Sequence, residues 1–158
     1  MKDLIKKYAD KYGLDPAIVY GICVKESCLN PKDPPSKWRL DTKATRFEKN
    51  WHYFYRSQPI PGVTDTEEQR DQATSWGLMQ VMGSVLREHG YKGVIPDILN
   101  DVEAQLDYGC KHLLKKIGKY GLYHGILAYN TGSPRMNMDG SFVNEGYLRR
   151  VIQYSKGY

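Results

Sequence analysis

Apolar residues recur every three or four positions along most of the chain, which is the spacing of an amphipathic helix. The clearest run follows Asp15-Pro16, where four apolar residues share one helical face: Ile18, Val19, Ile22 and Cys23. A polar cap followed by proline is typical of a helix N-terminus, and Asn30-Pro31 stops a helix. The pattern therefore predicts a largely buried helix from Pro16 to about Ser27.

The same spacing predicts further helices, separated by short segments rich in glycine, proline and asparagine. They cover residues 3–12, 45–55, 75–90, 100–117, 121–130 and 145–154. The helix from Asn100 opens with a polar residue and carries Glu103 three positions later, the arrangement of a capping box. Segments 31–37 and 59–65 are expected to be loops. No stretch alternates polar and apolar residues as a β-strand does, so the predicted fold class is all-α.

Length and composition fit one soluble domain. The 158 residues suffice for a single hydrophobic core, and we expect residues 1–158 to form one domain. Hydrophobic residues make up 41% and charged residues 26%, both ordinary for a globular protein. The net charge of +5 suits a polyanionic partner such as nucleic acid or bacterial cell wall. Because the basic residues are scattered and no helix gathers them on one side, we expect no nucleic-acid binding.

The sequence offers no metal site and no membrane segment. Its three cysteines and four histidines lack a metal-binding spacing, so neither a metal nor a cofactor is expected. The N-terminal stretch alternates charged and apolar residues, and the chain has no long apolar run. This predicts no signal peptide and no membrane insertion. We also expect a monomer.

Glu26 is the most suggestive candidate for chemistry, because it lies near the end of the helix that begins at Pro16. An apolar face would carry its carboxyl partly out of water, and the C-terminal end of a helix is its negative pole. Both effects favour the protonated acid, which is the form that a general acid requires near neutral pH. The alternative is an ordinary solvated glutamate at a helix end.

Three short runs lie in order along the chain: Glu26-Ser27-x-x-Asn30-Pro31, Ser75-Trp76-Gly77-Leu78-Met79-Gln80-Val81-Met82 and Ala128-Tyr129-Asn130-Thr131-Gly132. Each alone could be a helix end or core filler. Together they resemble the Glu-Ser, Gly-Leu-Met-Gln and Ala-Tyr-Asn signatures of the lytic transglycosylases, murein lyases of bacteria and phages, over residues 14–152. The resemblance implies a lysozyme-like helical domain whose cleft takes alternating N-acetylglucosamine and N-acetylmuramic acid.

The resemblance also implies roles for individual residues. Glu26 matches the single catalytic acid/base of the family. Residues that match its substrate-binding positions are Ser27, Met79, Gln80, Tyr129, Asn130 and, by position only, Tyr147. Tyr129 matches a residue that can hydrogen-bond the catalytic carboxyl. A module that only binds the cell wall would have little use for a buried acid, so the resemblance favours an enzyme.

A lytic transglycosylase of this kind cleaves the β-1,4 bond between N-acetylmuramic acid and N-acetylglucosamine with one carboxyl group. Glu26 would protonate the glycosidic oxygen, and the substrate's N-acetyl group would stabilise the positive charge in place of a second carboxylate. Glu26 would then take the proton from the C6 hydroxyl as that oxygen attacks C1. The product ends in a 1,6-anhydro sugar, and no water is consumed.

Residues 32–74 depart from simpler family members, in which the first two motifs are closer together. This insertion brings aromatic residues, which form either a sugar-stacking wall or a small satellite core, and several acids. Glu48, Asp65 or Asp71 could face Glu26 and orient a water molecule. The alternative function is therefore an inverting muramidase that hydrolyses the same bond, as the related goose-type lysozymes do.

The substrate implied by the resemblance lies in the cell wall or periplasm, although no signal peptide is predicted. We therefore expect delivery by a phage particle or by a lysis machinery, as for a phage endolysin or another bacteriolytic enzyme. The alternative is a mature domain trimmed from a longer precursor.

Overall fold

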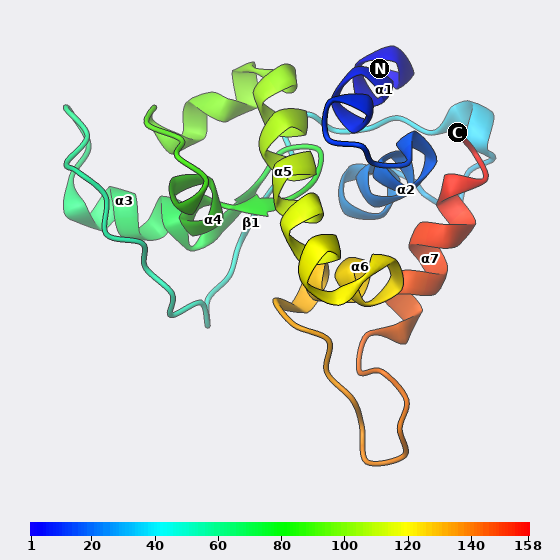
Figure 1. Ribbon diagram of the computed structural model, residues 1–158. Helices are drawn as coiled ribbons and strands as arrows, with labels where there is room; N and C mark the ends of the chain where they lie inside the picture. The colour runs from blue at the N-terminus through cyan, green and yellow to red at the C-terminus, as the bar shows by residue number, and fades with distance from the viewer.

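The structure is a computed structural model that describes residues 1–158, and it is mostly helical (Figure 1). Its α-helices are α1 (Lys2–Lys11), α2 (Pro16–Ser27), α3 (Asp65–Gln72), α4 (Gly83–Glu88), α5 (Val102–Tyr120), α6 (Leu122–Thr131) and α7 (Glu145–Ser155). The 3₁₀ segments are η1 (Pro35–Lys37) and η2 (Ile95–Asn100), and the strands are β1 (Thr45–Phe47), β2 (Thr74–Trp76) and β3 (Val81–Met82). The predicted all-α class is confirmed, with a small sheet added.

Helix α2 forms the centre of the apolar core. Asp15 caps it by accepting a hydrogen bond from the Ala17 amide, as the sequence predicts. Its apolar face is fully buried through Val19, Ile22, Cys23 and Val24. The backbones of α2 and α7 come close, because a Cβ atom on Gly21 would lie 2.4 Å from the carbonyl oxygen of Val151. This close packing fixes the end of α2, and with it Glu26, relative to α7.

Helices α5 and α6 pack against each other and contribute to the same hydrophobic cluster. The predicted capping box at the start of α5 is wrong, because the N-cap is Asp101, whose carboxylate accepts a hydrogen bond from the Ala104 amide. Glu103 instead accepts hydrogen bonds from Lys7 and Tyr8 of α1. The other helices predicted for this part of the core are confirmed as α1, α6 and α7.

A three-stranded antiparallel sheet replaces most of the helix predicted over 75–90. β1 pairs with β2, and β2 pairs with β3 through the turn that follows Trp76. Gly77 has a φ of +71° and Gln80 a φ of +48°, in the left-handed region that a continuous α-helix excludes. The Leu78 amide donates to the Gln105 side chain of α5 instead of to a helical carbonyl. Only α4 remains of that predicted helix.

The helix predicted over 45–55 is also wrong. Its apolar residues have helical spacing, but Phe47 is 55% exposed and Phe54 is 43% exposed, so no buried face stabilises a helix there. The backbone extends as β1 and continues as an irregular segment, and the Glu48 amide donates to the Ala73 carbonyl beyond the paired strands. The segment therefore lies along the edge of the small sheet.

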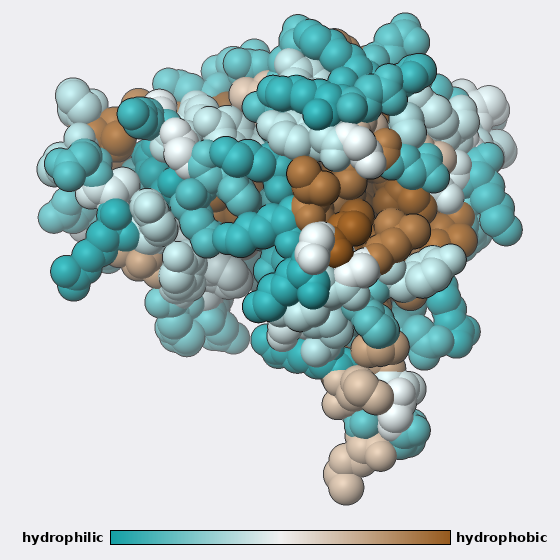
Figure 2. Space-filling model, in the orientation of Figure 1, coloured by the Kyte–Doolittle hydropathy of each residue, from teal (hydrophilic) through white to brown (hydrophobic).

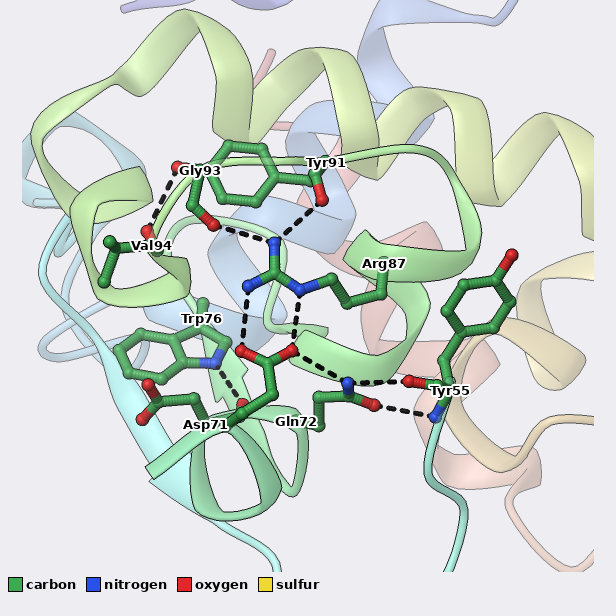
Figure 3. Close-up of polar contacts among 9 residues, drawn as sticks. Tyr55, Asp71, Gln72, Trp76, Arg87, Tyr91, Gly93 and Val94 are labelled. Carbon is green, nitrogen blue, oxygen red and sulfur yellow. Dashed lines mark hydrogen bonds and ion pairs between the residues drawn. The ribbon is translucent and has the colours of Figure 1, made fainter. Parts of the chain in front are cut away.

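A buried ion pair joins α3, at the end of the insertion, to α4 (Figure 3). Glu68 of α3 accepts two hydrogen bonds from the guanidinium of Arg87 in α4, at 2.7 and 2.9 Å. The same guanidinium donates to the carbonyl oxygens of Tyr91 and Gly93. The hydrogen bonds from Arg87 hold the pKa of the Glu68 carboxyl below its usual value. Both charges of the buried pair are therefore hydrogen-bonded.

Gln72 extends this network to the irregular part of the insertion. Its side-chain nitrogen donates to Glu68 and to the Tyr55 carbonyl, and its side-chain oxygen accepts from the Tyr55 amide at 2.7 Å. Figure 3 shows Gln72 between Tyr55 and the ion pair. One buried side chain thus ties a segment without regular secondary structure to α3.

Residues 133–144 form an arm that projects from the helical body between α6 and α7 (Figure 1). A bridge between Met136 and Phe142 closes it. Figure 2 shows a largely hydrophilic face with an apolar patch between α5 and α7, and the arm below it. No helix in the chain has both the length and the apolar character needed to cross a bilayer.

Candidate active site

A cavity of about 1520 Å³ adjoins the C-terminal end of α2, the small sheet, α5 and the end of α6. Residues from all three sequence motifs line it: Glu26, Ser75, Gln80, Tyr129 and Asn130. The pairing of β1 with β2 brings the insertion beside the second motif, since Arg46 lies opposite Ser75 in the register. The fold therefore gathers residues far apart in the sequence into one site.

Glu26 lies in the last turn of α2 and is partly exposed to the cavity. Burial raises the pKa of its carboxyl above the usual value. The Tyr147 hydroxyl and the positive charges of Lys25 and Arg46 oppose this shift, whereas the negative charge of Glu48 adds to it. The net effect favours the protonated form of Glu26 more than in water.

Tyr147 of α7 lies behind the cavity wall, next to Glu26. Its ring is only 4% exposed, and its buried hydroxyl has no hydrogen-bond partner of standard geometry. The hydroxyl is nevertheless close enough to interact with the Glu26 carboxyl. Burial raises the pKa of Tyr147 most, and the negative charge of Glu26 raises it further. The Lys25 ammonium lies 5.3 Å from the ring centroid. The Tyr147 hydroxyl is thus a potential hydrogen-bond donor beside the Glu26 carboxyl.

Gln80 shapes the wall of the cavity through its own hydrogen bonds. Its side-chain oxygen accepts from the Ser75 hydroxyl at 2.8 Å, and its nitrogen donates to the carbonyls of Ala44 and Gly77. These bonds hold the left-handed backbone of Gln80 and join the insertion to the turn between β2 and β3. The amide is thus engaged within the protein while it faces the cavity.

Tyr129 lies near Glu26 but bonds a different partner from the one predicted. Its hydroxyl donates to the backbone carbonyl of Met79 at 2.7 Å and not to the Glu26 carboxyl. Burial first and the charge of Glu26 second raise its pKa well above the usual value. The side chain of Met79 is fully buried against Gly109 of α5 and does not line the cavity.

Ser27 and Asn130 differ in their access to the cavity. The Ser27 side chain is buried, and its hydroxyl donates to the Cys23 carbonyl at 2.9 Å, so the structure does not bring it to the cavity wall. Asn130 is exposed, lines the cavity and accepts a hydrogen bond from Asn144 at the base of the arm. Only Asn130 of these two can reach a ligand directly.

The three acids expected as partners of Glu26 are not equivalent. Glu48 lines the cavity, where its carboxylate accepts a hydrogen bond from the Arg46 side chain at 2.5 Å. Asp65 is exposed in the first turn of α3, and Asp71 lines a separate, smaller pocket. Asp65 and Asp71 therefore lie outside this cavity, and only Glu48 of the three lines it together with Glu26.

Several aromatic rings of the insertion also line the cavity: Phe47, Trp51 and Tyr53. Between 37% and 55% of each side chain is exposed. The Trp51 ring nitrogen donates to the Ser84 hydroxyl of α4 at 3.2 Å, which holds the indole against the body of the protein. Because these rings remain open to solvent, they form an aromatic wall of the cavity and not a satellite core.

His112 of α5 is a cavity residue that the sequence motifs do not identify. Its Nδ1 lies 3.2 Å from the Nε2 of His89, and its ring centroid lies 5.3 Å from that of Tyr129. Burial and the neighbouring charges of Lys116 and His89 lower its pKa to about 3, so the ring is neutral at ordinary pH. The one feature of the sequence that could have indicated its burial is its position on the apolar face of the helix predicted from Asn100.

The acids, cysteines and histidines of the chain nowhere form a group of three or more that could hold a metal ion. A partly buried carboxyl, an adjacent tyrosine hydroxyl and exposed aromatic rings are suited to proton transfer on a polyol ligand.

Comparison with known families identifies the family of the chain. The Transglycosylase SLT domain family matches residues 3–145, which includes the insertion and all three motifs. No curated protein and no solved structure shows significant similarity to the chain. The family match supports a lytic transglycosylase acting on peptidoglycan, and the chain belongs to the Transglycosylase SLT domain family.

Proposed function

We propose that the protein cleaves the β-1,4 bond between N-acetylmuramic acid and N-acetylglucosamine, with Glu26 as the single acid/base and a 1,6-anhydro sugar as the product end. The observation that carries the proposal is a partly buried carboxyl, with a raised pKa, in the wall of a large cavity. Such a carboxyl stays protonated closer to neutral pH than a solvated one. The aromatic wall supports the proposal, since exposed rings stack on sugars.

In the first step Glu26 donates its proton to the glycosidic oxygen, and the bond between that oxygen and C1 breaks. The substrate's N-acetyl group stabilises the positive charge at C1, so no second carboxylate is required. Glu26 is left ionised beside Tyr147 and Lys25, which both favour the charged form. The buried Tyr147 hydroxyl can then donate to the new carboxylate, because it has no other partner.

In the second step the C6 hydroxyl oxygen attacks C1, and Glu26 takes the proton of that hydroxyl. The carboxyl returns to its starting form, and the sugar closes into a 1,6-anhydro ring without consuming water. The opposing influences on the Glu26 pKa suit this cycle, since burial favours the acid and the neighbouring donors favour the base.

A second candidate is hydrolysis by an inverting mechanism, with Glu48 orienting a water molecule. The observation that favours it is the presence of Glu48 in the same cavity, where its negative charge raises the Glu26 pKa. Against it, the Glu48 carboxylate already pairs with Arg46 at 2.5 Å. This pairing occupies the carboxylate oxygen that would have to hold the water molecule, so the lytic reaction remains the proposal.

Mass spectrometry of digested peptidoglycan tests the chemistry. We expect fragments one water lighter than hydrolysis products, because each cut closes an anhydro ring. The Glu26→Gln variant should lose activity by about 10²–10⁴-fold, since it keeps the shape of the side chain but cannot transfer a proton.

Glu48→Gln is the matched control, because it removes the cavity carboxylate that the second candidate requires. We expect this variant to keep anhydro products and most of the activity. Reducing-end products from the unchanged protein, or their disappearance in Glu48→Gln, would favour the hydrolase. Unchanged activity in Glu26→Gln would refute the assignment of Glu26.

A further inference from the structure

The lining of the cavity carries an excess of positive charge. Eight cationic residues line it: Lys25, Lys43, Arg46, Lys49, Lys115, Lys116, Lys119 and Arg135. Four acids line it as well: Glu26, Asp41, Glu48 and Glu88. The excess of four positive charges compares with a net charge of +5 for the whole chain. Cations that are scattered along the sequence are thus concentrated by the fold around one site.

The acids neutralise only a part of this charge. Glu48 pairs with Arg46, and Glu88 pairs with Lys115 at 2.8 Å. Of the remaining cations, Lys43 donates only to neutral oxygens, those of Leu99 and Asn100. The other cations that form no salt bridge are Lys25, Lys49, Lys116, Lys119 and Arg135. Most of the cationic lining is therefore available to an anionic ligand.

One group of these cations lies where α5 ends and the arm begins. Lys116 and Lys119 are three residues apart on α5, so they share a helical face. The Lys116 ammonium donates to the Gly132 carbonyl, which places it beside the start of the arm that carries Arg135. Lys119 and Arg135 are exposed and form no hydrogen bond through their side chains. We call Lys116, Lys119 and Arg135 the basic wall.

No acid of the protein forms a salt bridge with the basic wall. Burial, reinforced by the charges of Lys115 and Lys119, lowers the pKa of Lys116. Lysines near a helix C-terminus offset the helix dipole, which accounts for Lys119 in the last turn. This explanation does not extend to Arg135, which follows α6 after a glycine and lies on a different segment. An anion at the wall would relieve the mutual repulsion.

The chemistry of peptidoglycan supplies anions on the same sugar as the scissile bond. The sugars of the glycan strand carry no charge when the lactyl group is joined to a peptide. The stem peptide brings free carboxylates, and it hangs from the same N-acetylmuramic acid whose bond is cleaved. Cations without an acidic partner beside such a strand can therefore pair with these carboxylates.

We propose that the basic wall binds the carboxylates of the stem peptide, so that the enzyme selects glycan strands whose peptides are present and negatively charged. The proposal rests on the proposed function, because it places the wall beside a glycan strand in the cavity. Guanidinium and ammonium groups both bind carboxylates, and Arg135 can do so with two hydrogen bonds. The inference concerns substrate choice and adds no step to the reaction.

The test compares two forms of one soluble, uncross-linked strand. In both forms the peptide amines are acetylated, and in one form the peptide carboxylates are converted to primary amides. We expect kcat/KM to be about three- to tenfold higher for the strand with free carboxylates, the size expected for two exposed ion pairs. The preference should fall as salt is added, because exposed charges are screened.

The variant Lys119→Gln/Arg135→Gln should bring the ratio of the two kcat/KM values close to one, mainly through KM. The matched control is Lys32→Gln/Lys92→Gln, which removes the same charge at exposed positions away from the cavity. This control should keep the ratio of the unchanged protein. An equal loss in both variants would mean that net charge alone attracts the substrate, which would overturn the proposal.

A ratio of one for the unchanged protein would also overturn the proposal. The proposed function would survive that result, since anhydro products would still form from both strands. Added polyglycerol phosphate and free stem peptide can each be tested as inhibitors of strand cleavage. If polyglycerol phosphate inhibits more strongly, the basic wall binds phosphate polymers of the cell envelope and not the stem peptide. The two sources of anion are therefore distinguished.

Discussion

The helical core around α2 and the insertion 32–74 are stabilised by different kinds of contact. In the core, Val19 and Ile22 of α2 and Val151 of α7 are fully buried and apolar. The insertion packs few large apolar residues, and its centre is the network of Glu68, Arg87 and Gln72 (Figure 3). The first region depends on buried area, whereas the second depends on complete pairing of buried polar groups.

This difference matters for the site because the two regions supply different parts of the cavity. The core supplies Glu26 and Tyr129, and the insertion supplies Glu48 and the aromatic wall. An apolar contact that is lost costs free energy in proportion to its area. A buried charge that loses its partner costs more than the pair contributes when intact. The insertion side of the cavity is therefore more sensitive to single substitutions.

The largest expected effect comes from Arg87→Met, which leaves the Glu68 carboxylate buried without its partner. It also leaves the carbonyls of Tyr91 and Gly93 without a donor. Removal of one member of a buried ion pair costs about 3–5 kcal/mol in the free energy of unfolding. Urea unfolding measures this loss, and amide exchange should show it first in α3 and β2.

Lys115→Met is the matched control, because Lys115 also pairs with an acid of α4 but at an exposed position. An exposed pair contributes less than about 1 kcal/mol. Equal losses for Arg87→Met and Lys115→Met would mean that the buried network does not hold the insertion. The comparison between the two regions would then be wrong.

The same contrast explains which elements the sequence could predict. The helix from Pro16 to Ser27 was predictable because a side-chain cap, a proline and a buried apolar face agree. The helix expected over 45–55 was not formed, since Phe47 and Phe54 have helical spacing but no core to face. Helical spacing of apolar residues therefore predicts a helix only where those residues pack into a core.

The candidate site was predictable in some of its members but not in its contacts. The motifs identified Glu26, Gln80 and Tyr129, and the structure brings them to one cavity. The partner of the Tyr129 hydroxyl depends on a backbone position set by the turn before Gln80, which local sequence does not determine. The clustering of cations such as Arg135 depends on how distant segments fold together, and the sequence shows them as scattered.

Acid should affect the two regions in different ranges of pH. His112 of the core has a folded-state pKa of about 3, against an ordinary value of 6.5. Its unfolded form binds a proton first, so stability is complete above pH 6.5 and falls as the pH decreases toward 3, by about 2 kcal/mol at pH 5. The pKa of Glu68 in the insertion network is lowered from 4.5, so its contribution is lost only below that pH.

Urea unfolding at pH 7.5, 6 and 5 measures this dependence. The His112→Gln variant should lose less stability than the unchanged protein between pH 7.5 and 5. His52→Gln is the control, because His52 is exposed within the insertion and should leave the dependence unchanged. If His112→Gln retained the full dependence, another group would have to titrate, and His89 beside it would be the first to examine.

The smallest expected effect comes from the helix caps, one in each region. Asp15 caps α2 in the core, and Thr64 caps α3 in the insertion through a reciprocal capping box with Glu67. Replacement of either cap by alanine costs about 1 kcal/mol, because one backbone amide of the first turn loses its acceptor. Both losses are small enough to leave the fold intact.

The two caps contribute about equally to the free energy of unfolding, so their variants show whether the two regions unfold together. If they do, Asp15→Ala and Thr64→Ala should lower the midpoint of urea unfolding by similar amounts. If the insertion opens by itself, Thr64→Ala should instead accelerate amide exchange over Asp65–Gln72 and leave the exchange of α2 unchanged. The buried pair of Glu68 and Arg87 joins α3 to α4, so we expect the first result. The second would show that polar pairing positions the insertion without making it part of the cooperative core.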